Sequence, residues 1–293
     1  MRIPAALCGI VGFRPTIGRY PQEGIVPISH TRDTAGPMTR SVSDAALIDR
    51  VICGRKEGVD PAQLRGIRLG VPRFPFYENI HPAVANAMEG VLSRFMSYGI
   101  DLVEADMPEV VNIDDIAGFP IALYETVSDL NRYLDEHGTG LDFSSLVAGV
   151  ASPDVKAMLE RQIGREAVPE ALYRKAMHES RPALQTAYRE YFAKNRLSGI
   201  VFPTTPLPAA SIGQDKTVVL NGETVPTFPT FIRNTSPGSV AGIPGLSMPA
   251  GLSPDGLPIG VEIDGPFGED DRLLAVALAI EKREPSMAAP NLP

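Results

Sequence analysis

The chain has 293 residues, a formal net charge of −8 and 44% hydrophobic residues, which is enough for a large core. An acidic balance without a Lys/Arg-rich block argues against nucleic acid as a partner. The two cysteines, Cys8 and Cys53, do not make a disulfide framework, and no apolar run approaches the roughly 20 residues that span a bilayer. We therefore expect no membrane partner and a reducing, cytoplasmic location.

Residues 1–44 combine few charges with many Gly, Pro and small apolar residues. This composition is typical of backbone packed closely in an interior. The stretch begins without a preceding element, although buried backbone groups need hydrogen-bond partners. We therefore expect that a segment is missing upstream.

The next elements predict part of a parallel sheet. Ser41 and Asp44 form a capping box for a short helix that ends at Gly54. A strand at 67–72 precedes a helix that begins at His81-Pro82, and a second strand follows at 100–106. Strand, helix and strand within about forty residues indicate a βαβ unit.

Residues 110–198 are predicted to be a mostly helical insert that forms one wall of a cleft, with a kink or break at Pro182. The pattern then returns to strands, with a hairpin around Asn221-Gly222. The remaining predicted elements are strands at 199–203, 246–251 and 257–265, an amphipathic helix at 270–283, and a tail over the last ten residues.

No complete catalytic constellation emerges from spacing alone. The four histidines are dispersed, without an HExxH motif, so we expect solvated or capping histidines and no metal. No phosphate loop or dinucleotide motif predicts a cofactor, and we expect none. The nearest approach to a serine elbow is GLSMP, where Ser247 is interpreted as a strand residue.

Several blocks of the chain together resemble the amidase signature family. Met1-Arg2-Ile3-Pro4-Ala5 is similar to the block that follows the family's nucleophile, and the similarity continues through the Asp-Thr-x-Gly-Pro-Met-x-Arg-Ser-Val-x-Asp run at 33–44. It returns in FPTTPLPA, GIPGLSMPAG and GLPIGVEIDGPFGEDDRLLAVALAIE. The resemblance implies an α/β fold with a mixed, mostly parallel sheet flanked by helices. Residues 1–293 would be the C-terminal portion of a single amidase domain that lacks its N-terminal third.

The resemblance also implies hydrolysis of amide C–N bonds by a Ser–cis-Ser–Lys triad, through a covalent acyl-enzyme. In style the chain is closest to aryl-acetamide or mandelamide-type amidases, so the implied substrate is a small, aryl-containing amide that yields a carboxylate and ammonia. The nucleophilic Ser is expected immediately before Met1, and the cis-Ser and Lys further upstream. No catalytic residue is therefore placed in this chain, and we expect it to be inactive alone.

Other site residues are carried over from the family or suggested by their placement. Arg2, Cys8 and Asp33 match family positions that organise the site, and the two charged residues would need partners in an apolar region. For Cys8, a small buried hydrophobe is favoured over a reactive thiol. Candidates for the substrate pocket, with core packing favoured for the first, are Tyr124, Thr204, Thr205, Asn234 and Thr235.

Three interpretations of the chain remain open. It is the C-terminal part of an amidase, through a truncated gene or a misplaced start; it is one piece of a two-chain amidase; or it is a non-catalytic remnant that acts as a binding module. The expected partners are a small-molecule amide and either a second copy or the missing N-terminal piece. Loss of part of a sheet exposes a strand edge and an apolar face, so the isolated chain is expected to be poorly soluble or oligomeric.

Overall fold

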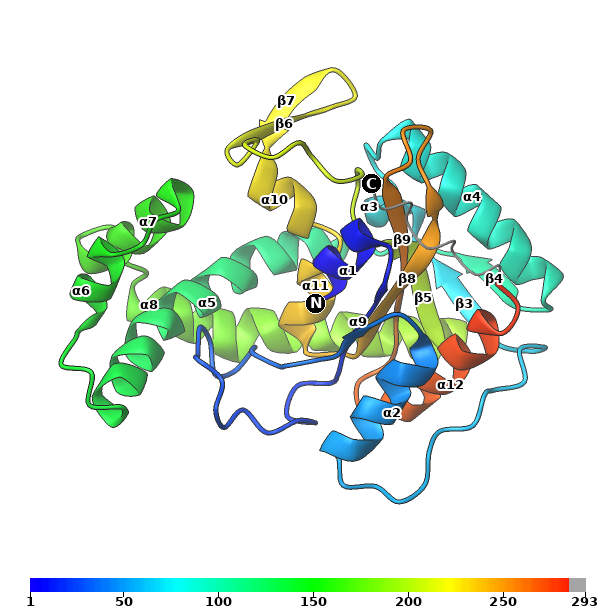
Figure 1. Ribbon diagram of the computed structural model, residues 1–293, viewed down its shortest axis with the longest axis horizontal. Helices are drawn as coiled ribbons and strands as arrows, with labels where there is room; N and C mark the ends of the chain where they lie inside the picture. Colours follow the sequence, from blue (N-terminus) through cyan, green and yellow to red (C-terminus); the bar gives the residue numbers. More distant parts are fainter. Residues whose placement is uncertain (285–293) are drawn as a thin grey trace, which may run out of the picture.

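A computed structural model describes residues 1–284, so the expected tail lies outside the described residues apart from its first position. A seven-stranded sheet forms the centre, in the order β2-β1-β8-β9-β5-β3-β4 (Figure 1). Its strands are β1 (Val11–Arg14), β2 (Met38–Thr39), β3 (Arg68–Val71), β4 (Asp101–Glu104), β5 (Gly199–Pro203), β8 (Gly245–Leu252) and β9 (Pro258–Asp264).

The expected α/β fold, with a mixed sheet flanked by helices, is confirmed, but within residues 1–284 the sheet is not mostly parallel: two of its six strand pairings are parallel and four are antiparallel. β3 runs parallel to both β4 and β5, and the remaining neighbours in the sheet are antiparallel. The βαβ prediction is also confirmed, because α4 (Pro82–Ser97) connects the parallel strands β3 and β4. His81 caps this helix through its side chain, and Pro82 occupies the first turn, where its missing N–H costs no hydrogen bond.

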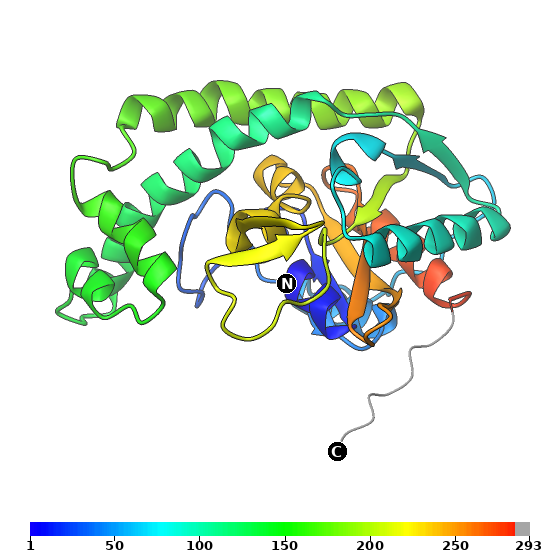
Figure 2. The same cartoon turned by 90° about the horizontal axis from the view of Figure 1, so that it is seen from above.

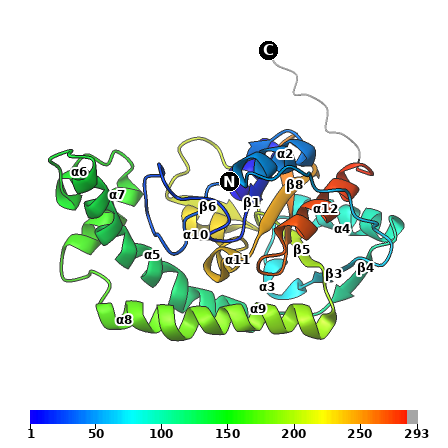
Figure 3. The same ribbon diagram turned by 90° about the horizontal axis from the view of Figure 1, so that it is seen from below.

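Helices cover both faces of the sheet, each over its own apolar cluster (Figure 3). One face is covered by α2 (Val42–Ile52), α4 and α12 (Asp270–Glu281). The other is covered by α5 (Glu109–Glu136), α9 (Arg181–Asn195) and α11 (Ser236–Ala241). The short helix α1 (Arg2–Cys8) contacts β1, β8 and β9.

The predicted helical region between β4 and β5 forms a long arm (Figure 2). α5 lies beside α8 (Glu170–Lys175) and α9, which are joined through the π-helical segment η2 (Ala176–Ser180). Pro182 follows η2 directly, so the predicted kink takes the form of a widened turn. The end of the arm holds α6 (Phe143–Ala148), α7 (Pro153–Glu160) and η1 (Arg161–Ile163).

The Asn221-Gly222 hairpin is present as β6 (Thr217–Leu220) and β7 (Glu223–Pro226). Both turn residues have positive φ, as the predicted two-residue turn requires. The remaining short helices are α3 (Arg73–Phe76) and α10 (Thr227–Ile232).

The opening stretch is only partly buried, which corrects the expectation for residues 1–44. β1 lies in the core, but most of residues 17–36 form an exposed or half-buried loop. Gly and Pro here mark turns at the surface, where backbone groups reach water. Within residues 1–284, no helix has the length and apolar character that crossing a membrane requires.

Candidate functional site

A cluster of buried charges surrounds the guanidinium of Arg2, which is 4% exposed. Its Nη1 donates to Glu262 Oε1 at 2.7 Å and to Asp264 Oδ1 at 3.1 Å. Its Nη2 donates to the Thr235 carbonyl oxygen at 2.7 Å. The partners that a buried Arg2 was expected to need are therefore present.

Strand geometry places both acids beneath α1. Glu262 and Asp264 are two residues apart on β9, so their side chains project from the same face of the strand. On the neighbouring strand β8, a Cβ at Gly245 would collide with Asp264 and crowd Arg2. Glycine at this position therefore leaves room for the ion pairs.

Arg14 belongs to the same cluster and was missed by the sequence analysis. Its side chain is buried, and Nη2 donates to the Gly238 carbonyl oxygen at 2.7 Å. Burial, reinforced by the nearby Arg2, lowers the pKa of Arg14 to about 9. Burial also raises the pKa of Glu262 to about 8, and that of Asp264 above its usual value. The sequence signal that could have found this cluster is a charged residue within an otherwise apolar strand. It occurs as Arg14 in VGFR, and as Glu262 and Asp264 in PIGVEID.

The Met1 end of α1 lies beside this cluster. Met1 directly precedes Arg2, which is the first residue of α1. Since the family nucleophile is expected next to Met1, the cluster adjoins the place where the resemblance puts the chemistry.

A cavity of about 300 Å³ borders the cluster. Asn234 and Ser236 line it, and they flank Thr235, the carbonyl partner of Arg2. Its other lining residues are mostly apolar or aromatic: Phe74, Pro75, Phe76, Glu78, Val111, Asp114, Asp115, Gly118, Phe119, Pro229, Ile232, Arg233 and Pro237. Burial raises the pKa of Asp114 to about 6, so this wall carries a carboxyl group that titrates near neutrality. The cavity suits a small ligand with an apolar body.

Two of the pocket candidates are fixed beside the end of β5. Thr204 is fully buried, and its Oγ1 lies 2.7 Å from Ser247 Oγ on β8. Thr205 Oγ1 donates to the Leu207 carbonyl oxygen at 2.8 Å. Both hydroxyls are engaged within the protein, and neither residue lines the cavity.

Asn234 and Thr235 lie nearer to the cavity. The Asn234 amide donates to the carbonyl oxygens of Pro203 at 2.7 Å and Phe76 at 3.0 Å, which ties the segment before α11 to β5 and α3. Of the five pocket candidates, Asn234 is the one that lines the cavity.

Tyr124 lies elsewhere, in the helical arm. Its ring stacks on Tyr173 with centroids 4.2 Å apart, and it does not line the cavity. This position agrees with the favoured interpretation of Tyr124 as a packing residue.

The other two family positions have different surroundings from Arg2. Cys8 is exposed, so the expectation of a small buried hydrophobe is wrong. α1 turns Ala5 and Ala6 toward the sheet, while Pro4 and Cys8, four residues apart, share its outer face. Asp33 Oδ2 accepts from the backbone N–H groups of residues 28 and 29 at 2.7 and 2.8 Å, so it closes a turn in the loop.

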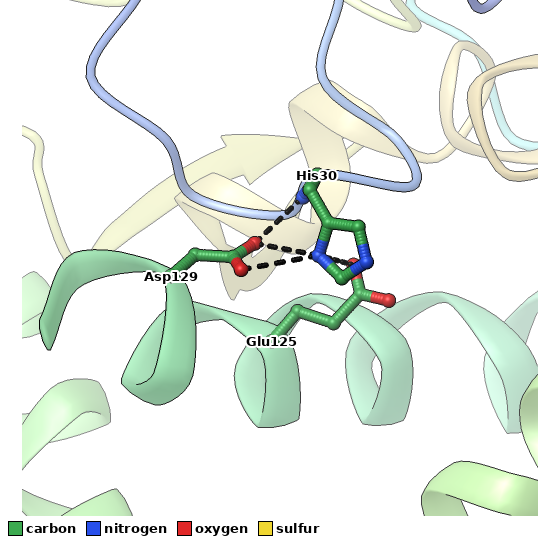
Figure 4. A group of neighbouring side chains, drawn as sticks. All are labelled: His30, Glu125 and Asp129. Atoms are coloured by element: carbon green, nitrogen blue, oxygen red, sulfur yellow. Dashed lines mark hydrogen bonds and ion pairs between the residues drawn. The ribbon is translucent and has the colours of Figure 1, made fainter. Parts of the chain in front are cut away.

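That loop is fastened to α5 by contacts that we call the loop clasp: Ser29, His30 and Thr31 bound to Glu125 and Asp129. Figure 4 shows three of these side chains, those of His30, Glu125 and Asp129. Ser29 Oγ donates to Glu125 Oε2 at 2.6 Å, and the His30 backbone N–H donates to Asp129 Oδ2 at 2.7 Å. Both carboxylates are 1% exposed. No motif in the sequence indicates that these residues lie together.

His30, Glu125 and Asp129 each offer an atom that can ligate a metal, all within 4.8 Å of one another. Protein donors already use these carboxylates, however: Tyr173 and Thr31 on Glu125, and the backbone and ring of His30 on Asp129. The arrangement therefore serves to hold the loop on the arm.

Comparison with known proteins places these features in a family. Residues 1–274 match the Amidase family. The chain belongs to the amidase family. It is 47% identical over 282 residues to an indoleacetamide hydrolase of Agrobacterium vitis, which covers 96% of this chain and 60% of that protein. A mandelamide hydrolase of Pseudomonas putida is 40% identical over 291 residues, with 96% of this chain and 56% of that protein covered.

Among solved structures, a crystal structure described as an amidase superposes with a TM-score of 0.80 at 29% identity. The match covers 97% of this chain and 60% of that amidase. This chain thus spans about 60% of the length of the amidases that it matches.

Proposed function

We propose that this chain is part of an amidase that hydrolyses the C–N bond of a small, aryl-containing amide to a carboxylate and ammonia. The observation that carries the proposal is its similarity, over 96% of its length, to relatives named indoleacetamide hydrolase and mandelamide hydrolase. Both names denote amides that carry an aromatic ring.

The cavity supports an aryl substrate. Its volume of about 300 Å³ lies at the small end of the range for ligand pockets. Phe74, Phe76 and Phe119 contribute aromatic surface to its walls. Burial of an aromatic ring against such side chains stabilises the bound substrate, and the polar lining residues Asn234 and Ser236 are left to orient the amide.

The proposed chemistry is acyl transfer. A serine oxygen attacks the amide carbonyl, the C–N bond breaks as nitrogen takes up a proton to leave as ammonia, and water then releases the carboxylate. We assign the serine pair and lysine of this reaction to the part of the amidase fold that this chain does not span. Arg2 then acts as a positioning residue, because it holds the Met1 end of α1 against β9.

We further place the protein in the cytoplasm and treat residues 1–293 as a portion of one amidase domain, with the helical arm as an insert. Its small-molecule partner is the amide. Its macromolecular partner is the remainder of the amidase fold.

The test is co-expression of this chain with the part of the A. vitis indoleacetamide hydrolase that it does not span. Ammonia release is measured with indole-3-acetamide, phenylacetamide and acetamide. We expect kcat/KM for the aryl amides to exceed that for acetamide at least about 10-fold, because burial of a ring stabilises the bound transition state.

The matched variant is Phe119→Ala, which removes one aromatic wall of the cavity. It should lower kcat/KM for the aryl amides and leave that for acetamide nearly unchanged. A purified complex that releases no ammonia from any of the three amides would overturn the proposal.

A further inference from the structure

One carboxyl group on the wall of the cavity lacks a hydrogen-bond donor. Asp114 lies in the second turn of α5, which begins at Glu109, and it lines the cavity together with the aromatic rings of Phe76 and Phe119. Its Oδ1 atom is buried and has no hydrogen-bond partner among residues 1–284. Burial of a carboxyl oxygen without a donor is unfavourable, so Asp114 needs a donor that the described chain does not supply.

The packing of α5 on α11 fixes the position of this carboxyl group. Gly118 follows Asp114 by about one helical turn, and a Cβ on Gly118 would lie 3.3 Å from both Asp114 Oδ1 and Val240 Cγ2. Ser236 Oγ would lie 3.7 Å from the same Cβ. Asp114 Oδ1 is therefore held at the seam between the two helices. A ligand that binds a carboxyl group held in this way does not have to order it first.

The charges around Asp114 compensate only partly for its burial. Burial raises the pKa of Asp114 to about 6, aided by the charge of Asp115, although the Ser236 side chain and the charge of Arg32 lower it. Arg32 comes from the loop before β2, and its Nη1 donates to the Gly118 carbonyl oxygen at 2.6 Å. Above pH 6 Asp114 is therefore mostly an anion with acceptor capacity to spare, next to a positive charge.

Other ionisable side chains near Asp114 do not supply the donor. Arg233 lines the cavity, but its Nη2 donates to the backbone carbonyl oxygens of Glu78 and Asn79. Glu78 is itself an acid, which offers only acceptors when it is ionised. The Tyr188 hydroxyl is buried without a partner as well, so it does not donate to Asp114. The described chain thus leaves an acceptor in the cavity wall for a ligand to satisfy.

We propose that Asp114 is a specificity-determining residue, which accepts a hydrogen bond from an N–H or O–H group on the ring system of the substrate. A neutral donor fits better than a cation, because Arg32 already places a positive charge at this wall. The ring lies against Phe76 and Phe119, with its donor toward Asp114. The inference rests on the proposed function, since it narrows the aryl amides to those whose ring carries such a donor.

The test measures binding of the ring alone, without hydrolysis. Indole and benzofuran have the same fused-ring shape but differ by an N–H group in place of an oxygen, and neither contains an amide. The chain has no Trp, so the fluorescence of indole can be excited selectively, and its anisotropy gives the Kd. Displacement of indole gives the Kd of benzofuran. At about pH 7.5 we expect indole to bind at least about 10-fold more tightly, because hydrogen bonds to a charged acceptor are the strong ones.

The preference should depend on Asp114 and on its charge. In the natural chain it should diminish as the pH falls through about 6, where Asp114 takes up a proton. Asp114→Asn keeps the shape and a neutral acceptor, so it should show a smaller preference that does not change with pH. Asp114→Leu removes the acceptor and should bring the two Kd values within about 2-fold of each other.

A folding defect is distinguished by thermal melts. Asp114→Leu should melt no lower than the natural chain, because an apolar side chain replaces a poorly compensated buried acid. The control is Asp135→Asn, which changes an exposed acid on the same helix and should bind both rings as the natural chain does.

Three results would overturn the assignment of Asp114: equal affinities for the two rings in the natural chain, a preference that Asp114→Leu leaves intact, or a natural chain that binds neither ring. The proposed function fails separately, because the two rings contain no amide. A complex that releases no ammonia, from a chain that still selects indole through Asp114, contradicts the proposed function alone. Hydrolysis of aryl amides together with ring binding that ignores Asp114 contradicts this inference alone.

Discussion

At the scale of single residues, Arg2 is the centre of the candidate site. It binds two acidic side chains that β9 holds in the interior, and it joins them to the backbone before α11. Removal of one partner from a buried ion pair leaves the other charges without compensation, which costs more than the pair itself contributes.

We therefore predict that Arg2→Met lowers the free energy of unfolding by about 3 kcal/mol or more. The matched control is Arg73→Met, which removes a partly exposed arginine paired with Glu89 and Glu104 and should cost no more than about 1 kcal/mol. Urea unfolding followed by circular dichroism measures both. Equal losses in the two variants would contradict a central role for Arg2.

The same cluster predicts a dependence of stability on pH. Burial raises the pKa of Glu262 from its ordinary 4.5 to about 8, so between these values the folded state holds a proton that the unfolded state has released. This contribution is fully present below pH 4.5 and is lost as the pH rises through 8.

Glu262→Gln imitates the protonated carboxyl group, so we predict that the variant gains stability relative to the natural chain as the pH rises from 5 to 8. The difference in unfolding free energy should grow by at most about 1.4 kcal/mol per pH unit. Urea unfolding at several pH values measures it, and a difference that is flat over this range would show that Glu262 is ionised throughout.

A site residue can be found from the sequence when its place in the site is determined by residues close to it along the chain. Arg2 was found because it lies in a family motif, and its need for partners follows from charge alone. Its partners were not found, because they lie 260 and 262 positions away and only the tertiary fold chooses them. For Cys8, composition indicated burial, but the rotation of α1 about its axis decided exposure.

At the scale of elements, the local signals were sufficient. The turn at Asn221-Gly222 and the helix cap at His81 each involve only residues a few positions apart in the sequence, and both are present. The loop clasp is different, since it joins residues 29–31 to two acids nearly a hundred positions later on α5. Neither segment shows a pattern by itself that indicates the other.

We predict that Glu125→Ala opens this loop. The variant leaves the hydroxyls of Ser29, Thr31 and Tyr173 without their acceptor, and hydrogen bonds to a charged group are stronger than neutral ones. Limited proteolysis within residues 17–36 should accelerate at least about 10-fold. Asp135→Ala, an exposed acid on the same helix, is the control and should leave the cleavage rate unchanged.

A metal titration tests how the clasp is held. Because protein donors occupy both carboxylates, we predict that about 1 mM Zn²⁺ or Mn²⁺ shifts the Tm by less than about 1 °C. A larger increase in Tm that His30→Ala abolishes would instead identify His30, Glu125 and Asp129 as a cation site.

At the scale of the whole molecule, the exposed apolar side chains of α2, namely Leu47, Ile48, Val51 and Ile52, predict self-association of the isolated chain. Exposed apolar surface next to a free strand edge favours contact between copies. Sedimentation velocity should show association that increases with protein concentration and decreases in the Leu47→Lys, Val51→Lys double variant. A monodisperse monomer that melts cooperatively would contradict this prediction.

The pairing of Arg2 with β9 also determines the order in which the molecule can fold. At about 5–20 residues per second, roughly 13–52 seconds separate the synthesis of Arg2 from that of its partner 260 positions later. During that interval α1 has neither its acids nor β8 and β9, two of the three strands that it contacts, and closing so long a chain segment costs entropy before those contacts form. The arginine at the centre of the candidate site is thus made about 260 residues before its acidic partners and can be secured only after β9 has left the ribosome.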